Sequence, residues 1–180
     1  ERVRVAADLI AAEPDEPWIA WVGLNDEGRE LADLVPGAVL VEGQHSPESK
    51  ADAIGSFVRG DARVIVSKTS IFGFGLNLQR CARMVFVGLS DSYEAYYQAV
   101  RRCWRFGQTR PVHAYIVLTE PEEAIYANVL RKQREAEATA SELVKHVEQF
   151  ERSEIASVGL REDAPHSQPM RLPAWIQGAA

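Results

Sequence analysis

Short apolar runs alternate along the chain with segments in which apolar residues recur every three or four positions. Runs of this length are typical of buried strands, and the three-to-four spacing is typical of helices that bury one face. Five strands are predicted, at residues 18–22, 38–41, 64–66, 84–87 and 112–118. Helices are predicted at residues 3–12, 25–34, 47–59 and 91–106, followed by a longer helix from 121 to about 151.

Local signals mark the starts of two of these helices. Ser46 offers a capping hydroxyl directly before Pro47, and proline is favoured at the first helical position. Asp91 and Glu94 have the spacing of a capping box, so we expect Asp91 to begin the fourth helix.

The order of the elements indicates the fold class. Strands that alternate with helices form a mainly parallel sheet covered on both faces, an α/β three-layer sandwich. We predict this domain at residues 1–120, a C-terminal helical extension at 121–152, and an extended, proline-containing tail at 153–180. In this class ligands bind beyond the carboxyl ends of the strands, so the loops after residues 22, 41, 66 and 87 are of most interest.

Composition excludes several classes of protein. The 180 residues are 46% hydrophobic, enough for one α/β domain with a core, and no apolar run is long enough for a membrane helix. Without a signal peptide, and with Cys81 and Cys103 far apart, a reducing, cytoplasmic setting is expected. The four scattered histidines predict no metal site, and a start at Glu1 suggests a longer parent protein.

Charge is distributed unevenly along the chain. The net charge is −6, yet residues 62–119 carry eight basic and two acidic residues, a local charge of +6. The remainder of the chain is therefore −12. A positive segment in an acidic protein indicates a defined anionic ligand, although solvated arginines are the simpler alternative.

Three arginines gather in the predicted helix 91–106. At 100° per residue, Gln98, Arg102 and Arg105 share one side, Arg101 lies close by, and the aromatic residues lie opposite. Like charges at this spacing repel, and guanidinium groups suit phosphate oxygens. The stripe thus indicates an anionic, phosphate-bearing ligand.

The segment Q-A-V-R-R-C-W-R-F-G-Q, residues 98–108, resembles helicase motif VI in its Swi/Snf-type form, Q-A-x-x-R-x-x-R-x-G-Q. The resemblance implies the C-terminal RecA-like lobe of a superfamily 2 helicase-like ATPase. In such enzymes two arginines reach the phosphates of ATP across a cleft between two lobes. By position Arg105 corresponds to the arginine finger, Arg102 to its partner, and Gln98 to the residue that orients them. A finger stabilises the charge that builds up during phosphoryl transfer.

Upstream, residues 67–79, S-K-T-S-I-F-G-F-G-L-N-L-Q, look like motif V, whose core reads G-x-G-x-N-L. Glycines let a backbone approach an anion and present N–H groups to it. The resemblance implies that this loop contacts the nucleic-acid backbone and couples it to the ATP site. The candidate residues are Gly73, Gly75 and Asn77 on the nucleotide side, and Lys68, Thr69 and Ser70 on the nucleic-acid side.

Two further resemblances add to this picture. Residues 41–44, V-E-G-Q, are similar to the family's turn that contacts nucleic acid, so Gly43 and Gln44 are candidate contacts, and an ordinary turn is the alternative. The sequence of residues 71–79 is more similar to phage and prophage helicase-like proteins than to eukaryotic remodellers. This resemblance implies that the cytoplasm is that of a bacterial or phage-infected host cell.

The sequence lacks G-x-x-x-x-G-K-[ST] and a strand that ends in an Asp-Glu pair. These motifs hold the phosphates and Mg²⁺, so this chain is expected to be inactive alone and to complete an ATP–Mg²⁺ site held mainly by an N-terminal lobe. The expected partner is nucleic acid, and DNA is favoured over RNA. The extension would brace the other lobe, dock a methyltransferase or nuclease, or cap the domain. The alternatives are a stand-alone nucleic-acid-binding or regulatory lobe, and an unrelated protein that binds a small phosphorylated ligand.

Overall fold

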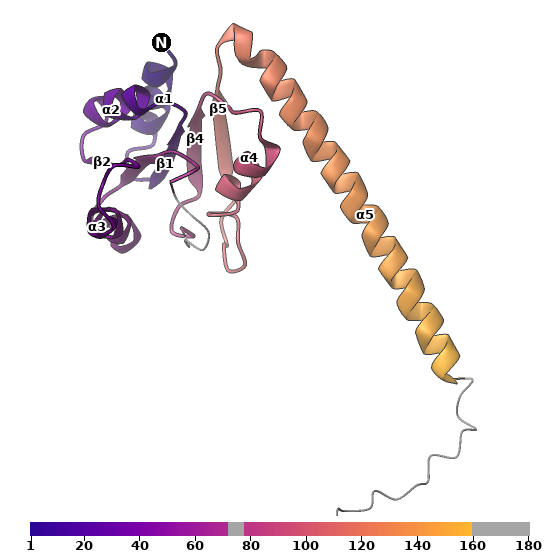
Figure 1. Ribbon diagram of the computed structural model, residues 1–180. Helices are drawn as coiled ribbons and strands as arrows, with labels where there is room; N and C mark the ends of the chain where they lie inside the picture. The colour runs from indigo at the N-terminus through magenta and orange to yellow at the C-terminus, as the bar shows by residue number, and fades with distance from the viewer. Residues whose placement is uncertain (72–77, 160–180) are drawn as a thin grey trace, which may run out of the picture. The chain divides into compact units, whose positions relative to one another are not determined.

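A central parallel sheet organises the chain. The computed structural model describes residues 1–71 and 78–159, and within this part the strand order is β2-β3-β1-β4-β5 (Figure 1). Neighbouring strands are parallel throughout. The strands are β1 Trp18–Val22, β2 Ala38–Val41, β3 Val64–Ser67, β4 Arg83–Val87 and β5 His113–Val117. All five predicted strands are therefore confirmed, each to within one residue at either end.

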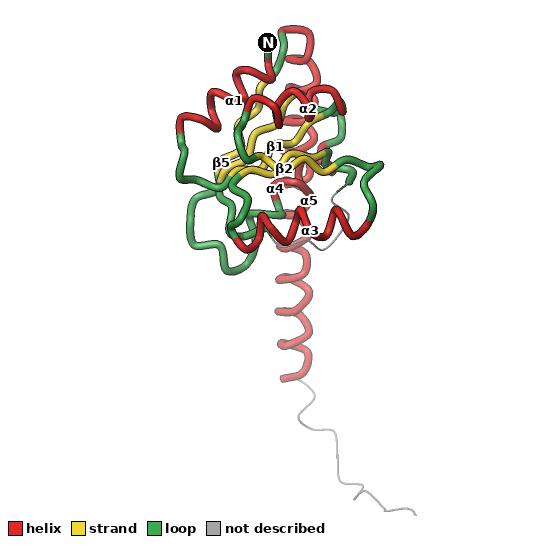
Figure 2. The backbone as a smooth tube through the Cα atoms, turned by 90° about the vertical axis from the view of Figure 1, so that its left-hand side faces the viewer, coloured by secondary structure: helices red, strands yellow, loops and turns green. Residues whose placement is uncertain are grey.

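Helices cover both faces of this sheet, as Figure 2 shows. The helices are α1 Arg2–Ala12, α2 Asn25–Leu34, α3 Pro47–Arg59, α4 Tyr93–Val100 and α5 Glu123–Gly159, with a short 3-10 turn η1 at Glu120–Glu122. Side chains alternate along each strand, so β1 buries Trp18 against α1 and α2, and Trp21 against α3 and α4. The three-layer α/β sandwich predicted from the pattern is confirmed.

The first strand lies where the chain changes direction across the sheet. From β1 the chain builds β2 and β3 on one side, and then crosses to build β4 and β5 on the other. The carboxyl ends of β1 and β4 therefore flank the point where connections diverge, the place at which α/β proteins most often bind ligands.

The start of α3 is as predicted. The Ser46 hydroxyl accepts from the Ser49 N–H at 3.2 Å, and Pro47 occupies the first turn. The helix ends at Gly60 with φ of 101°, a conformation that favours glycine.

The start of α4 differs from the prediction. Ser92 is the N-cap, and its hydroxyl accepts from the Ala95 N–H at 3.1 Å. Asp91 instead accepts from Lys132 Nζ at 3.2 Å and from the Asn128 amide, and these hydrogen bonds lower the pKa of its carboxyl. Asp91 is thus a tertiary contact for the start of α5, a role that sequence spacing does not reveal.

The predicted helix 91–106 also ends early, at Val100, so the prediction of a single helical stripe is wrong. Beyond it, the N–H groups of Arg102 and Cys103 bond to carbonyls three residues back, which tightens the chain into turns. The cause is tertiary: Cys103 is fully buried, and the Arg102 carbonyl accepts from the Leu78 N–H at 3.1 Å. Gln98, Arg102 and Arg105 therefore do not share one helix face.

Helix α5 continues to Gly159, beyond its predicted end. Contacts divide the chain into a unit at residues 1–134 and a second unit from 135 onward. In the first unit, the beginning of α5 buries Val129. In the second, the described helix exposes several apolar side chains, namely Leu143, Val144, Val147 and Phe150. In the part of the chain that the structure describes, no helix is both long and apolar enough to cross a bilayer.

Candidate functional site

Residues 101–108 form a compact arginine turn that is held from one side by a single glutamine. The Gln108 amide donates to the carbonyls of Gln79, Cys81 and Cys103, at 2.9, 3.2 and 3.3 Å. Its oxygen accepts from the Arg110 N–H at 3.1 Å. One side chain thus ties the arginine turn to the loop that leads into β4.

A second set of contacts holds the same turn to the loop before β4. The Gln79 amide donates to the Phe106 carbonyl, beside the Leu78 to Arg102 backbone bond described above. Gly107 has φ of 95°, and a Cβ there would lie 3.3 Å from the Gln79 amide nitrogen. The backbone that carries the arginines is therefore rigidly placed.

The arginine side chains project from this held backbone into different surroundings. Arg102 is half-buried, and burial together with the nearby charge of Arg105 lowers the pKa of its guanidinium. Arg105 is exposed, and among the described residues no hydrogen bond or ion pair engages its side chain. Two like charges therefore lie close together, and one of them is partly removed from water.

Arg101 lies against aromatic rings. Its guanidinium sits 5.8 Å from the centre of the Tyr97 ring and 5.5 Å from that of Trp104. Neither ring belongs to the core, since Tyr97 is 38% and Trp104 is 55% exposed, and Ala99 and Cys103 supply the buried contacts instead. Gln98, predicted to orient the arginines, makes no hydrogen bond to them within the described residues, and Gln108 holds the turn in its place. Sequence signals placed Gln108 in the motif without indicating this role.

Half of the basic residues between 62 and 119 are structural. Arg83 pairs with Glu13 at 2.8 Å and Arg110 with Glu16 at 2.8 Å. The other two donate to backbone carbonyls: Arg63 to those of Ile10, Glu13 and Glu16, and Arg80 to those of Phe57 and Ala62. Acidic residues outside the segment thus neutralise part of its predicted positive charge.

The candidate nucleic-acid residues meet at the other edge of the sheet, in the carboxyl-edge loops, residues 42–46 and 68–71. These loops follow neighbouring strands, which the Ser67 hydroxyl joins by donating to the Val41 carbonyl at 2.9 Å. Gly43 and Gln44 follow β2, and Lys68, Thr69 and Ser70 follow β3. Sequence reasoning thus identified groups that the fold brings together.

Local contacts engage parts of the loop that follows β2. The Lys50 ammonium donates to the Gly43 carbonyl at 2.7 Å, and the Gln44 amide donates to the Glu42 carboxylate at 2.8 Å. Glu42 is buried and also pairs with Arg29, with 3.1 Å between Nε and Oε1. This network shapes the turn. Gly73, Gly75 and Asn77 lie outside the residues that the structure describes.

A cleft of about 260 Å³ opens where β1 and β4 end. Aromatic side chains of Trp21, Phe86 and Tyr96 line it, together with the Thr69 and Ser90 residues of the adjoining loops. An ion-paired cluster closes one side, with 2.5 Å between Arg2 and Glu27 and 2.7 Å between Arg2 and Glu122. The cleft therefore adjoins the loop that carries Lys68 and Thr69.

The candidate residues thus form two sites rather than one. The arginine turn contacts Leu78, Gln79 and Cys81, which precede β4, and so it lies at the amino ends of the parallel strands. The carboxyl-edge loops and the cleft lie at the opposite ends. One edge is rich in arginine and the other in backbone and hydroxyl groups, and helices and strands rigidly connect the two.

Neither site contains a metal-binding cluster of side chains. Within residues 1–71 and 78–159, no group of three or more His, Cys, Asp or Glu side chains is arranged to hold a metal ion. Cys81 and Cys103 are buried free thiols, and their mutual hydrogen bond and burial raise the pKa of Cys103. They pack in the core, as predicted.

Comparison with known proteins links this arrangement to one domain family. Residues 29–107 match the family described as "Helicase conserved C-terminal domain". The match runs from within α2 to Gly107, so it includes the carboxyl-edge loops and most of the arginine turn.

Two curated proteins are similar to part of the chain. The chain is 35% identical over 94 residues to human "ATP-dependent DNA helicase Q4", covering 52% of this chain and 7% of that protein. It is 27% identical over 113 residues to the Drosophila melanogaster "Transcriptional regulator ATRX homolog", covering 61% of this chain and 9% of that protein. The chain spans less than a tenth of the length of either relative.

One solved structure supports the fold. The C-terminal part of the Fun30 ATPase domain superposes with a TM-score of 0.63 at 18% identity, covering 71% of this chain and 44% of that one. The predicted RecA-like fold, followed by a C-terminal helix, is confirmed by this likeness and by the strand order.

Proposed function

We propose that this chain, which contains a helicase C-terminal domain at residues 29–107, is the second RecA-like lobe of an ATP-dependent DNA helicase or translocase of Swi/Snf type. Arg105 acts as the arginine finger on ATP–Mg²⁺, and Arg102 is its partner. The carboxyl-edge loops, through Gly43, Gln44, Lys68, Thr69 and Ser70, contact a DNA strand.

The observation that carries this proposal is the construction of the arginine turn. Its backbone is held by Gln108 and Gln79, while the Arg105 guanidinium is exposed beside a second, partly buried arginine. Holding like charges together costs free energy, and a bound phosphate offsets this cost. A held backbone keeps the exposed Arg105 guanidinium within reach of one place, where it could bind the phosphate oxygens that gain charge in the transition state.

The rest of the nucleotide site would come from another lobe. The described residues provide no carboxylate cluster for Mg²⁺, and the sequence has no phosphate-binding P-loop. Gly73, Gly75 and Asn77, with Gln98, are proposed to line this lobe's side of the nucleotide site by their resemblance to helicase motifs. An N-terminal RecA-like lobe is thus the required partner.

The separation of the two sites on one rigid sheet supports translocation. If ATP draws the two lobes together at the arginine turn, this whole lobe moves, and with it the DNA contacts at the carboxyl edge. A DNA helicase among the relatives favours DNA as the nucleic acid. A phage or prophage origin rests on the wording of residues 71–79 alone and stays a prediction.

The test is DNA-stimulated ATPase activity in a protein that contains both lobes. Arg105→Ala should lower kcat by about 10³-fold or more, and Arg105→Lys should restore little because lysine lacks the planar fork. Arg59→Ala is the matched control, since Arg59 is exposed and its one ion pair among the described residues is with exposed Asp61, at 3.0 Å.

Two results would overturn the assignment. A near wild-type kcat for Arg105→Ala would exclude Arg105 as the arginine finger. A wild-type two-lobed protein that binds DNA without ATPase activity favours the alternative, a nucleic-acid-binding or regulatory lobe that takes no part in hydrolysis.

A further inference from the structure

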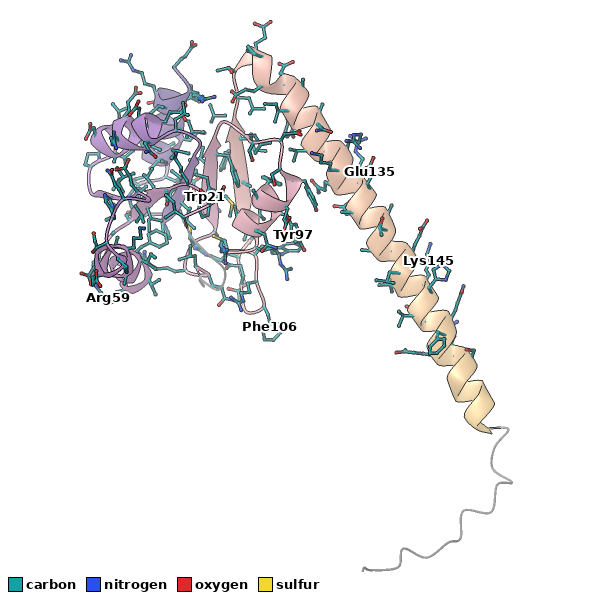
Figure 3. The ribbon with its side chains drawn as sticks, viewed as in Figure 1. Trp21, Arg59, Tyr97, Phe106, Glu135 and Lys145 are labelled. Atoms are coloured by element: carbon teal, nitrogen blue, oxygen red, sulfur yellow. The ribbon has the colours of Figure 1, made fainter. Side chains whose placement is uncertain are left out.

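Aromatic residues flank Arg105 on both sides, and both are exposed. Phe106 is as exposed as in an extended chain, at 101%, and Trp104 is 55% exposed. Figure 3 shows Phe106 at the tip of its loop, pointing away from the sheet and helices. All three side chains of the aromatic–arginine–aromatic triplet are therefore exposed.

The exposure of Phe106 is imposed by the backbone. Its carbonyl accepts from the Gln79 amide, and the next residue, Gly107, takes a conformation that glycine favours. Gln108 then holds the chain to the loop before β4. The held loop therefore keeps Phe106 in solvent, next to exposed Arg105 and close in sequence to exposed Trp104.

The ring of Trp104 is positioned by its neighbours. Arg101 packs over it at 5.5 Å and over Tyr97 at 5.8 Å, which builds a short stack of two rings around one guanidinium. Such cation–π contacts orient the ring while leaving part of it free to receive another planar group.

Charge restricts the kind of molecule that fits this surface. No acidic residue occurs between residues 95 and 119, while Arg101, Arg102 and Arg105 lie within five positions. The ligand should therefore combine negative charge with a flat aromatic group. A nucleoside triphosphate carries both in one molecule, and base–aromatic stacking tolerates many bases.

We propose that Phe106 and Trp104 form a stacking surface for the base of the nucleotide whose phosphates meet Arg105. The inference rests on the proposed function and adds a second group on the same ligand. Arg105 then binds charge and Phe106 binds the base, so the two residues select for different parts of the nucleotide.

The test separates base from phosphate in this chain. Binding of ATP and of inorganic tripolyphosphate is followed by nuclear magnetic resonance titration up to millimolar ligand. Phe106→Ala should weaken ATP by about five- to tenfold and leave tripolyphosphate within about twofold. Arg105→Ala should weaken both. Phe150→Ala is the matched control, because Phe150 is 62% exposed on α5, in the second unit.

The following outcomes would overturn the stacking surface, and none of them tests the assignment of Arg105 as the arginine finger. If Phe106→Ala weakens both ligands alike, or neither, no base stacks there. If it weakens single-stranded DNA but not ATP, the surface serves the strand instead. If Arg105→Ala weakens binding of both ligands while Phe106→Ala weakens neither, the stacking surface is wrong and the proposed function stands. If wild-type chain binds neither ligand, the surface is rejected, and the two-lobe ATPase assay judges Arg105 independently.

Discussion

Replacement of Gln108 by alanine should destabilise the chain and release the arginine turn from the loop before β4. This side chain is half-buried and bridges three carbonyls and one N–H group that belong to two different loops. Alanine keeps the backbone and removes every one of these bonds. The arginines themselves are untouched, so any effect on them must come through their placement.

The cost follows from counting the hydrogen bonds. The Gln108 amide has two hydrogens for three carbonyls, so it makes two full bonds, and its oxygen accepts a third. At about 1 kcal/mol each, and less where water replaces them, the loss is about 2 kcal/mol. For a unit of this size that corresponds to a fall in Tm of about 6–10 °C.

Urea and thermal unfolding of the chain, followed by circular dichroism, measure this loss. Gln108→Glu should destabilise more than alanine at neutral pH, because a carboxylate has no donor and faces three carbonyl oxygens. Gln149→Ala on the exposed part of α5 is the control and should change stability by less than about 0.5 kcal/mol. If Gln108→Ala lowers the free energy of unfolding by less than that, or if Gln108→Glu destabilises less than Gln108→Ala, the Gln108 hydrogen bonds do not hold the arginine turn.

Three further perturbations probe other parts of the chain. Gly88→Ala should lower the free energy of unfolding by about 2 kcal/mol, because φ is 79° and the new Cβ would lie 3.0 Å from the Glu122 carboxylate. Gly37→Ala is the control and should lower it less, because Gly37 also has a positive φ but no atom within 4 Å of the new Cβ; equal losses would exclude the clash. Burial raises the pKa of Glu122, but hydrogen bonds to Thr119 and Arg2 outweigh it and lower that pKa, so ionised Glu122 stabilises the fold fully above the ordinary carboxyl pKa and less as pH falls through the lower folded-state pKa. Between about pH 5 and pH 2, Glu122→Gln should therefore lose less free energy of unfolding than the wild type does, and an equal loss would contradict this. Lys68→Ala should reduce the salt slope of single-stranded DNA binding by about 1, while Lys145→Ala on α5 leaves it unchanged; equal slopes would remove Lys68 from the interface.

The charge pattern shows where sequence reasoning reached its limit. Counting along residues 62–119 predicted one positive surface. Tertiary contacts divide it, because Glu13 and Glu16 reach Arg83 and Arg110 from far away in the sequence. A linear count cannot register neighbours that only folding supplies.

The apolar pattern along the chain was sufficient to determine the sheet, the two helical layers and the strand boundaries. These features depend on local periodicity and on the burial of one face at a time, which a sequence displays directly. The start of α3 at Pro47 followed from the same kind of local signal.

Only the tertiary structure decided where α4 ends and what holds the arginines. Burial of Cys103 and the bonds from Leu78 and Gln108 draw residues 101–108 out of the helix that their periodicity favours. Helix propensity contributes tenths of a kcal/mol per residue, whereas a buried side chain with several hydrogen bonds contributes several times as much. The long-range contacts therefore prevail, and they place the arginines on a held turn at the edge of the sheet.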